Sequence, residues 1–339
     1  MERKITENTI ITEALELNPN AAAILMSYGM HCLGCPHSRG ESIEDACRAM
    51  GIDVKGKKTL VLGSGGAACA VVYALEQMGA NVVVISRSGE NNYQNLDRHF
   101  DASVIVNTTP VGMYPENCLS PIDLKPFLKC QGVIDLIYNP ARTNLLLQAE
   151  ALGLKAINGL WMLVAQAKES AEWFTGNKID DALIPRIYNH LKTQMENIVL
   201  IGMPGCGKTT VGTILAKKCG REYVDTDAVI TQKTGKTIPQ IFAEVGEVGF
   251  RKLETEVLSE VSKCSGLVIS TGGGCVTNPE NYPLLHQNSK IFWLKRDLND
   301  LPTDGRPLSQ SCGVAELYKQ RAAHYKAFAD VETDVSSSV

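Results

Sequence analysis

The sequence lacks three features that would place the protein in a membrane, outside the cell or on nucleic acid. No run of apolar residues approaches the roughly 20 that a membrane-spanning helix needs. The first ten residues, MERKITENTI, contain no apolar segment typical of a secretory signal, so we expect a cytoplasmic protein. The formal net charge is -4 at pH 7, which removes the non-specific attraction to nucleic acid. We therefore expect small-molecule substrates, without a membrane or nucleic-acid partner.

Cysteine is frequent, but its arrangement does not indicate disulfides. The 11 cysteines are an odd number and lie scattered along the chain, mostly within apolar patterns. That distribution is typical of free thiols in a reducing compartment. With 339 residues the chain is long enough for two to three domains of roughly 150 residues. Its patterning predicts three domains, which comprise residues 1–54, 55–194 and 195–339.

Residues 1–54 are predicted to form a small, all-helical domain, because their apolar residues recur at helical spacing. The segment contains the motif His31-Cys32-Leu33-Gly34-Cys35-Pro36-His37. Three interpretations of the cysteines stay open: small buried thiols, a redox pair, or part of a metal site to which Cys47 contributes. The motif resembles the Gly-Met-His-Cys-x-Gly-Cys-Pro signature of a small, uncharacterised helical family. That resemblance implies no activity.

The remainder of the chain alternates short apolar runs with helical patterns. In the middle domain we expect strands at 59–62, 81–85, 103–107 and 132–136, with helices at 67–78 and 160–174. A linker helix is expected at 180–194. In the last domain we expect strands at 198–201, 222–226, 267–270 and 290–294, with helices at 208–218, 247–261 and 314–329. This alternation predicts parallel sheets with helices on their faces, that is, an α/β protein.

The strongest motif in the chain is a phosphate-binding loop. Gly202-Met203-Pro204-Gly205-Cys206-Gly207-Lys208-Thr209 fits G-x-x-x-x-G-K-[ST] at every fixed position, after a predicted strand and before a predicted helix. Backbone N–H groups and the helix dipole would face the phosphates there. Lys208 would reach the β- and γ-phosphates, and the Thr209 hydroxyl would ligate Mg²⁺. The predicted ATP-binding residues are Gly205, Cys206, Gly207, Lys208, Thr209 and Thr210.

Two pairs of charged residues follow the loop. Asp225 and Asp227 stand at i, i+2 and would share one face of the predicted strand 222–226. There they could hold Mg²⁺ and accept a proton from an attacking hydroxyl, or simply be solvated. Arg251 and Glu254 stand at i, i+3 and share a helix face, as a surface ion pair or as part of a site.

Three further elements complete the series. Thr271-Gly272-Gly273-Gly274 ends a predicted strand with glycines, so that a small ligand could approach the backbone closely. Gly305-Arg306-Pro307-Leu308 lies in a polar loop, which makes Arg306 a candidate lid residue for the transferring phosphate. Arg321, near Tyr325 on the last predicted helix, is a second cation that could meet a carboxylate.

Together, in this order, the motifs resemble shikimate kinase over about residues 197–330. The resemblance implies a P-loop kinase with three α/β/α layers that transfers the ATP γ-phosphate to the 3-hydroxyl of shikimate, with Mg²⁺. It implies catalytic roles for Lys208, Asp227 and Arg306, and metal binding by Thr209 and Asp225. Substrate binding would fall to Asp227, Arg251, Glu254, Gly273 and Arg321, where the arginines clamp the carboxylate. Arg306 would also bind ATP from the lid.

The sequence departs from this family pattern in two places. The stretch between the predicted strand 290–294 and Arg306 is short, and no arginine stands where many members stack one on adenine. The family also continues through an adenine loop and a further helix, whereas this sequence ends at Val339. We therefore expect weak ATP binding and poor selectivity for adenine.

A second nucleotide motif lies in the middle domain. Gly63-Ser64-Gly65-Gly66-Ala67-Ala68 fits the dinucleotide fingerprint G-x-G-x-x-A between a predicted strand and helix. The next predicted strand ends in Ser86-Arg87-Ser88 in place of an acidic residue, which suits the 2′-phosphate of NADP unless Arg87 is merely solvated. The predicted residues for this cofactor, NADP(H), are Gly63, Gly65, Gly66, Ala67, Ser86, Arg87 and Ser88.

This segment resembles the Rossmann-like, NADP-binding half of shikimate dehydrogenase through residues 107–113, 135–140 and 159–166, and the position of Gln166 touches substrate in that family. The Asn-Val-Thr-x-Pro-x-Lys pattern, which carries the catalytic Lys of the other half, appears nowhere in the chain. We therefore expect NADP(H) binding without dehydrogenase activity, unless a partner chain supplies the missing half. The alternatives to a kinase are an NADP-dependent shikimate dehydrogenase, truncated and inactive alone, or a nucleotide-binding regulatory module.

Overall fold

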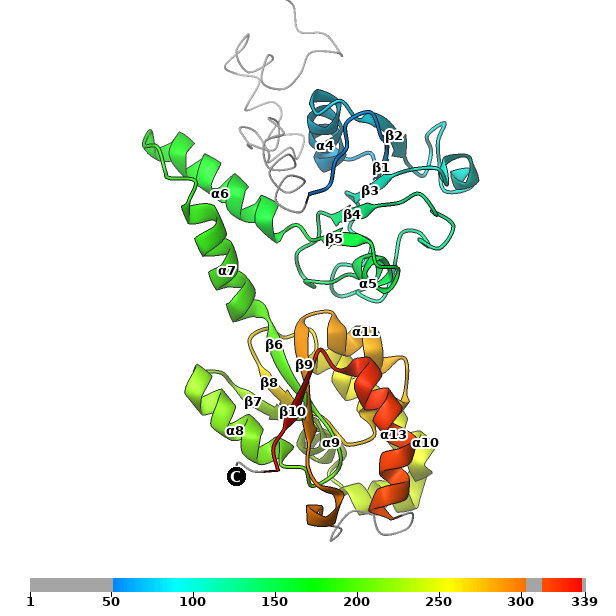
Figure 1. Ribbon diagram of the computed structural model, residues 1–339, viewed down its shortest axis with the longest axis vertical. Helices are drawn as coiled ribbons and strands as arrows, with labels where there is room; N and C mark the ends of the chain where they lie inside the picture. The colour runs from blue at the N-terminus through cyan, green and yellow to red at the C-terminus, as the bar shows by residue number, and fades with distance from the viewer. Residues whose placement is uncertain (1–50, 303–312, 337–339) are drawn as a thin grey trace, which may run out of the picture. The chain divides into compact units, whose positions relative to one another are not determined.

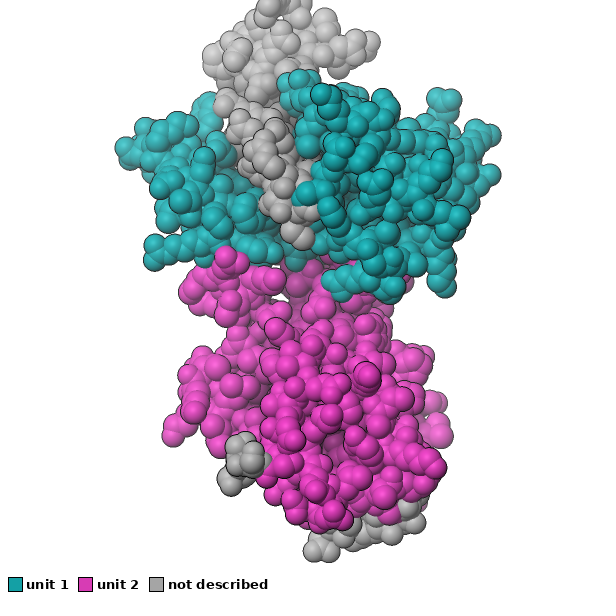
Figure 2. All heavy atoms as spheres, in the orientation of Figure 1, with its two compact units in different colours: residues 1–110, 121–137, 149–188 teal, residues 111–120, 138–148, 189–339 magenta. Residues whose placement is uncertain are grey.

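The computed structural model describes residues 51–302 and 313–336, which divide into two compact units (Figures 1 and 2). Unit 1 comprises residues up to 110, 121–137 and 149–188, and unit 2 comprises residues 111–120, 138–148 and those from 189 onward. Each unit contains a five-stranded sheet in which every strand pair is parallel. The predicted α/β class is therefore confirmed. The predicted domain boundaries stay predictions, and the Cys32–Cys35 motif lies outside the described residues.

The sheet of unit 1 has the strand order β2-β1-β3-β4-β5. Its strands are β1 (Lys58–Leu62), β2 (Asn81–Ile85), β3 (Val104–Asn107), β4 (Gly132–Asp135) and β5 (Lys155–Ile157). The helical elements of this part of the chain are α4 (Gly66–Gln77), η2 (Leu96–His99), α5 (Asn144–Ala151), α6 (Leu160–Thr175) and α7 (Leu183–Met195). All residues of β3 and β4 are buried, as expected for central parallel strands covered on both faces.

The sheet of unit 2 has the order β10-β9-β6-β8-β7. Its strands are β6 (Asn197–Ile201), β7 (Tyr223–Asp225), β8 (Val268–Ser270), β9 (Ser289–Lys295) and β10 (Val331–Asp334). The helices are α8 (Lys208–Cys219), α9 (Thr226–Thr234), α10 (Ile238–Val261), α11 (Asn281–His286) and α13 (Val314–Phe328), with short turns η3 (Cys275–Thr277) and η4 (Leu298–Asp300). In Figure 1, α8 and α13 lie on opposite sides of this sheet.

The centre of the second sheet determines where its loops meet. β6 pairs with β8 on one side and β9 on the other, with Leu200 opposite Ser270 and Phe292. The loops that follow these strands therefore leave the same edge of the sheet side by side. In open parallel sheets, ligands bind at this carboxyl edge.

The structure corrects the predicted placement of Asp225 and Asp227. β7 ends at Asp225, whose side chain caps α9 by accepting hydrogen bonds from the backbone N–H groups of Asp227 and Ala228. Asp227 thus lies in the first turn of a helix and does not share a strand face with Asp225. The reason is local: aspartate is among the best helix N-caps, so the chain turns into a helix one residue earlier than expected.

The predicted elements of unit 2 do not include α9, α11, β10 or the first half of α10. α10 begins at Ile238, after a capping box formed by Thr237 and Gln240, and only its second half, from Glu247, was expected. The two halves join at Gly246, whose backbone is non-helical with φ 68° and ψ -176°. β10 is an edge strand with alternating exposed residues that pairs with β9.

Two observations relate to the predicted location of the protein. Within residues 51–302 and 313–336, none of the helices combines the length and apolarity that crossing a membrane requires. The cysteines in the same ranges are free thiols: Cys69, Cys118, Cys130, Cys206, Cys219, Cys264 and Cys275. The cytoplasmic location itself stays a prediction.

Candidate active site

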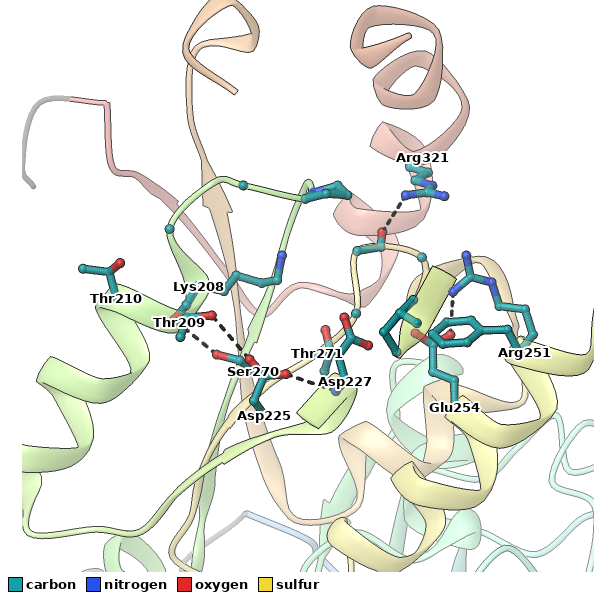
Figure 3. Close-up of a pocket in the computed structure, with 18 of the residues that line it drawn as sticks. Lys208, Thr209, Thr210, Asp225, Asp227, Arg251, Glu254, Ser270, Thr271 and Arg321 are labelled. Atoms are coloured by element: carbon teal, nitrogen blue, oxygen red, sulfur yellow. Dashed lines mark hydrogen bonds and ion pairs between the residues drawn. The ribbon is translucent and has the colours of Figure 1, made fainter. Parts of the chain in front are cut away.

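A cavity of about 440 Å³ opens at the carboxyl edge of the sheet in unit 2 (Figure 3). The loop after β6, the start of α9, the helix α10, the loop after β8 and Arg321 of α13 contribute to its wall. The predicted kinase-site residues that line it are Gly205, Gly207, Lys208, Thr209, Thr210, Asp225, Asp227, Arg251, Glu254, Gly273 and Arg321. Cys206 does not line the cavity and is buried, while Arg306 lies outside the described residues.

The phosphate side of the cavity is formed by the loop between β6 and α8. Gly205 and Gly207 have positive φ of 84° and 99°, a conformation that residues with a side chain rarely adopt. Lys208 is only 8% exposed, and its ammonium group donates hydrogen bonds to the carbonyl oxygens of Gly202, at 2.9 Å, and Met203, at 3.0 Å. The loop therefore holds its cation in place without a ligand.

Asp225 forms hydrogen bonds both with this loop and with the first turn of α9. The Thr209 hydroxyl donates to Asp225 Oδ2 at 3.3 Å, while Asp225 Oδ1 accepts from the Asp227 backbone N–H at 3.0 Å. Thr209 and Asp225 thus form a hydroxyl–carboxylate pair at the cavity edge. In Figure 3, Asp227 lies between the Lys208 side of the cavity and the side of Arg251 and Glu254.

Asp227 has the properties of a reactive carboxyl group. Its Oδ1 atom is buried and accepts no hydrogen bond from the described residues. Burial raises the pKa of Asp227, the nearby charge of Asp225 raises it further, and Lys208 and Arg251 oppose the shift. A desolvated carboxyl group with a raised pKa in a cavity is a candidate general base.

Arg251 and Glu254 form a buried ion pair, which excludes the alternative of a surface pair. Arg251 Nη1 donates to Glu254 Oε2 at 2.7 Å, and the side chain of Glu254 is 0% exposed. Arg251 Nη2 also reaches Glu247, at 3.1 Å. Burial raises the pKa of Glu254, and the charge of Arg251 opposes that shift. Within the described ranges, Glu254 Oε1 and Arg251 Nε are buried without a hydrogen-bond partner.

The three glycines after β8 form a backbone wall against these side chains. A Cβ atom on Gly272 would lie 2.5 Å from Glu254 Oε1 and 2.8 Å from Asp227 Oδ1, and one on Gly274 would lie 2.0 Å from Arg251 Nη2. The carbonyl oxygen of Gly273 accepts hydrogen bonds from Arg321 Nη1, at 3.3 Å, and from the Tyr325 hydroxyl. Any larger residue would push the charged groups away from the cavity.

Sequence reasoning missed the apolar part of the wall and one cation. Ile238 and Phe242 line the cavity from the unpredicted first half of α10, and Phe250 from the second half. The ring centroids of Phe242 and Phe250 are 4.6 Å apart. The i, i+4 spacing of Ile238 and Phe242 after a capping box would have revealed this helix face. Arg296, just after β9, also lines the cavity.

In unit 1, the structure brings the predicted dinucleotide motif and the segment after β2 together. Leu62 pairs with Ile85, and the Gly63 N–H donates to the carbonyl oxygen of Ile85 at 2.8 Å. Gly63 has a φ of 111°, and α4 begins directly after Gly65. Among the predicted cofactor residues, Gly65, Gly66, Ala67, Arg87 and Ser88 are exposed, while Gly63 and Ser86 are partly buried.

Two family models match the chain. One, described as Shikimate kinase, matches residues 204–339, and one described as Domain of unknown function (DUF1858) matches residues 5–56. The shikimate kinase of Synechococcus elongatus (strain ATCC 33912 / PCC 7942 / FACHB-805) is 42% identical over 151 residues, which cover 42% of this chain and 78% of that protein. The shikimate kinase of Thiobacillus denitrificans is 39% identical over 156 residues, which cover 42% of this chain and 84% of that protein.

Two solved structures are similar to different parts of the chain. The shikimate kinase from Acinetobacter baumannii in complex with shikimate is 38% identical and has a TM-score of 0.42, with 44% of this chain and 88% of that chain covered. The shikimate dehydrogenase 1 from Peptoclostridium difficile is 35% identical and has a TM-score of 0.43, with 45% of this chain and 60% of that chain covered.

Proposed function

Since the chain belongs to the shikimate kinase family, we propose that its unit 2 transfers the γ-phosphate of ATP to the 3-hydroxyl of shikimate. The observation that carries this proposal is the content of one cavity. A phosphate-binding loop lies on one side, two arginines and a buried glutamate lie on the other, and Asp227 lies between the two sides. Phosphoryl transfer needs donor and acceptor held in line with little covalent participation by the protein, and this arrangement suits that requirement.

The acceptor side matches a small polyhydroxylated carboxylic acid. Arg251 and Arg321 would bind the carboxylate, because guanidinium groups make short, charge-assisted hydrogen bonds to it. Asp227 Oδ1 and Glu254 Oε1 would accept hydrogen bonds from hydroxyl groups. Both atoms are buried without partners among the described residues, and an unsatisfied buried polar group costs about 1–3 kcal/mol. A bound acid with hydroxyls in the right places removes those costs.

The reacting groups follow from the same geometry. Asp227 would orient the 3-hydroxyl and take its proton as the hydroxyl oxygen attacks the γ-phosphorus. Lys208 and the N–H groups of the loop would stabilise the charge on the transferring phosphoryl group. Arg306, which lies outside the described residues, is proposed to add a further positive charge from the lid.

The Thr209–Asp225 pair fits Mg²⁺. This ion prefers oxygen ligands and commonly takes only one or two protein groups besides phosphate oxygens and water. Among the described residues no three His, Cys, Asp or Glu side chains are grouped to hold a metal, so the ion would depend on the nucleotide. When bound with ATP, it would neutralise the charge of the phosphates.

The test is phosphate transfer by the full chain with ATP, Mg²⁺ and shikimate, followed as shikimate-dependent ADP release. Arg251→Ala should weaken shikimate binding by about 10- to 100-fold, the loss of a charge-assisted contact. Lys252→Ala is a matched control, because Lys252 is the next residue on the helix and is exposed. ADP release that does not depend on shikimate, or equal shikimate affinity in the two variants, would contradict the proposal.

We further propose that unit 1 binds NADP(H). The support is the exposed glycine turn at the start of α4, next to the exposed Arg87 that would pair with a 2′-phosphate. Hydride transfer also requires a wall that positions the alcohol and a residue to take its proton. We propose that a partner chain would have to supply both. The test is NADPH binding by fluorescence; shikimate-dependent NADPH formation by the chain alone would instead favour the dehydrogenase alternative.

The three-domain organisation is also a proposal. The two family models match separate segments, 5–56 and 204–339, and unit 1 has its own sheet and its own core, which includes Val61, Leu75 and Ile134. This supports domains at 1–54, 55–194 and 195–339. Limited proteolysis should release fragments that end near residues 54 and 194, and cleavage within one of the sheets before either boundary would contradict these limits.

A further inference from the structure

Tyr223 stands two residues before Asp225 on the strand β7, so the two side chains lie on one face of that strand. The Tyr223 hydroxyl donates a hydrogen bond to Asp225 Oδ2 at 3.3 Å. The Thr209 hydroxyl donates to the same oxygen, also at 3.3 Å. Two hydroxyl groups from different parts of the chain therefore meet at one carboxylate oxygen, at the edge of the cavity that Lys208 also lines.

We propose that Tyr223 is a positioning residue for Mg²⁺, because its hydroxyl holds the Asp225 carboxylate in the orientation in which Thr209 and Asp225 bind the ion. The inference rests on the proposed kinase function, since the ion would reach this pair together with the nucleotide. Tyr223 is not among the residues that line the cavity. It would therefore act on the ion only through Asp225, without touching the nucleotide or the acceptor.

The two oxygens of Asp225 are held in different ways. Oδ1 accepts from the backbone N–H groups of Asp227, at 3.0 Å, and Ala228, at 3.4 Å, so its place is set by the start of α9. Oδ2 instead accepts from the two hydroxyl groups. Both of these distances exceed the roughly 2.8 Å typical of a hydroxyl and its oxygen acceptor, and contacts in a site are often longer before its ligand binds. Oδ2 is thus the oxygen whose place depends on Tyr223.

The direction of one hydrogen decides whether Thr209 can bind a cation. A hydroxyl group has a single hydrogen and two lone pairs. While that hydrogen points to Asp225 Oδ2, a lone pair of the Thr209 oxygen is left for Mg²⁺. If Oδ2 turned away, the hydrogen would lose its acceptor and could face the cation, which would repel it. The Tyr223 hydroxyl supplies a second donor that keeps Oδ2 beside Thr209.

The helix α8 leaves room for the Tyr223 ring beside this pair. A Cβ atom on Gly212 would lie 2.5 Å from Tyr223 Cε2 and 3.1 Å from Ser270 Oγ. Glycine is a poor residue for a helix interior, so the close approach of the ring gives Gly212 a packing role. The ring also packs against the hydrophobic core of unit 2. A phenylalanine would fill the same space, which leaves the hydrogen bond to Asp225 as the contribution of the hydroxyl.

The experiment measures ADP binding by the full chain, without shikimate, by calorimetry in Mg²⁺ and again in EDTA. The ratio of the two affinities gives the gain that the ion provides. Tyr223→Phe should lower this ratio by about 10-fold, the order found when a group that orients a metal ligand is removed. Its affinity for metal-free ADP should stay within about 2-fold of the parent. Tyr282→Phe is the matched control, since it removes a hydroxyl from α11, which precedes the amino end of β9.

The same variants separate a loss of metal binding from a loss of catalysis. In Tyr223→Phe, the Mg²⁺ concentration that gives half of the maximal shikimate-dependent ADP release should also rise by about 10-fold. The kcat at saturating Mg²⁺ should stay within about 2-fold of the parent, because every group proposed to touch the substrates is still present. Tyr282→Phe should match the parent in both quantities.

The outcomes separate this proposal from the kinase function. An unchanged affinity ratio in Tyr223→Phe, or no gain from Mg²⁺ in the parent, would overturn it. So would an equal loss in the EDTA measurement or in Tyr282→Phe, because the change would then act on the fold and not on the ion. Failure of the parent chain to phosphorylate shikimate would count against the proposed function only, because ADP binding is measured without the acceptor. A lower ratio confined to Tyr223→Phe is the supporting result.

Discussion

The two glycine-rich turns of this chain hold similar places in their sheets but differ in backbone and in surroundings, with a φ of -82° at Gly65 and 99° at Gly207. Both follow a central parallel strand and open a helix, α4 after Gly65 and α8 after Gly207. In both turns the first glycine is crowded, because an added Cβ would lie 2.6 Å from the Thr108 hydroxyl at Gly63 and 2.6 Å from the Leu294 carbonyl oxygen at Gly202. The cations differ: Lys208 follows its turn and is buried, whereas Arg87, near the other turn, is exposed.

The comparison leads us to expect that a reaction depends on the side chains that surround such a turn. Asp225, Asp227 and Arg251 reach the cavity of unit 2 from two other points in the chain, the junction of β7 with α9 and the helix α10. At the turn of unit 1, Gly65, Gly66 and Ala67 remain exposed, with Arg87 at the end of the next strand. We therefore expect chemistry at one turn and binding at the other.

The largest expected effect is at Lys208. Lys208→Met keeps the length of the side chain but removes the charge that we propose stabilises the transferring phosphoryl group. We expect kcat to fall by about 10²–10³-fold or more, as for removal of a preorganised electrostatic contact. The rate of shikimate-dependent ADP release measures this. A variant with near-normal kcat would show that Lys208 is not needed for the reaction, so the two turns would no longer differ in this respect.

The glycines offer a direct test of what surrounds each turn. Gly274→Ala places a Cβ where Arg251 Nη2 now lies, so the guanidinium must move and shikimate affinity should fall by about 10- to 100-fold. Gly66→Ala is the matched change in unit 1, where the space is open. It should leave the melting temperature and shikimate affinity unchanged. Equal affinities in the two variants would mean that the glycine wall does not position Arg251.

The variant Asp227→Asn should show how much the buried carboxylate of Asp227 lowers the stability of the fold. Its raised pKa means that the neutral carboxyl favours folding below the unfolded value of 3.8, and that this contribution is lost as pH rises through the folded value. At pH 7 a buried charge remains, which Asp227→Asn removes. We expect this variant to be inactive but more stable at pH 7, by about 1–3 kcal/mol, with a smaller gain near pH 4.

Asp225→Ala serves as the control for that stability measurement. Asp225 caps α9, so its removal should destabilise the protein by about 1 kcal/mol at pH 7, opposite in sign to Asp227→Asn. Thermal unfolding at pH 4 and pH 7 measures both variants. Destabilisation by Asp227→Asn at pH 7 would show that its carboxylate contributes to the fold in place of opposing it.

The smallest effect is expected at Arg87. Arg87→Ala should reduce the preference of unit 1 for NADPH over NADH by about 10-fold, the order of one exposed charge-assisted contact to a phosphate. Fluorescence titration with both cofactors measures the ratio. An unchanged ratio would show that Arg87 does not select between NADPH and NADH. The glycine turn of unit 1 would then have no selective side chain beside it, unlike the turn of unit 2.

Much of the fold could be predicted because local patterns decide it. β2 spans Asn81–Ile85, the predicted range, because NVVVI is a continuous apolar run between turn residues. β10 was missed because VETD alternates on an edge and has no such run, so only its pairing with β9 makes it a strand. Asp225 was placed on a longer strand because capping competes with strand extension, and the sequence alone does not decide between them.

Only those residues of the site that belong to a recognisable sequence motif could be predicted. The loop around Lys208, the Arg251–Glu254 spacing and the glycines after β8 were all visible in the sequence. Which glycine contacts which charge depends on how α10 packs against the glycines after β8 and against η3, and no pattern encodes that. Arg296 was missed because a single cation after a strand looks the same whether it is solvated or lines a cavity.

Gly246 divides the helix α10 into two halves, which contribute different side chains to the cavity. On one side of its non-helical backbone lie Ile238 and Phe242, and on the other lie Phe250, which completes the apolar wall, and the charged pair Arg251 and Glu254. The helix backbone is interrupted at Gly246, and the contact between the rings of Phe242 and Phe250, 4.6 Å apart, links the two halves. Substitutions that reshape the wall without moving this ring contact can therefore alter which ring sizes the cavity admits while the anchoring charges keep their places, so selectivity and catalytic competence can change independently over evolutionary time.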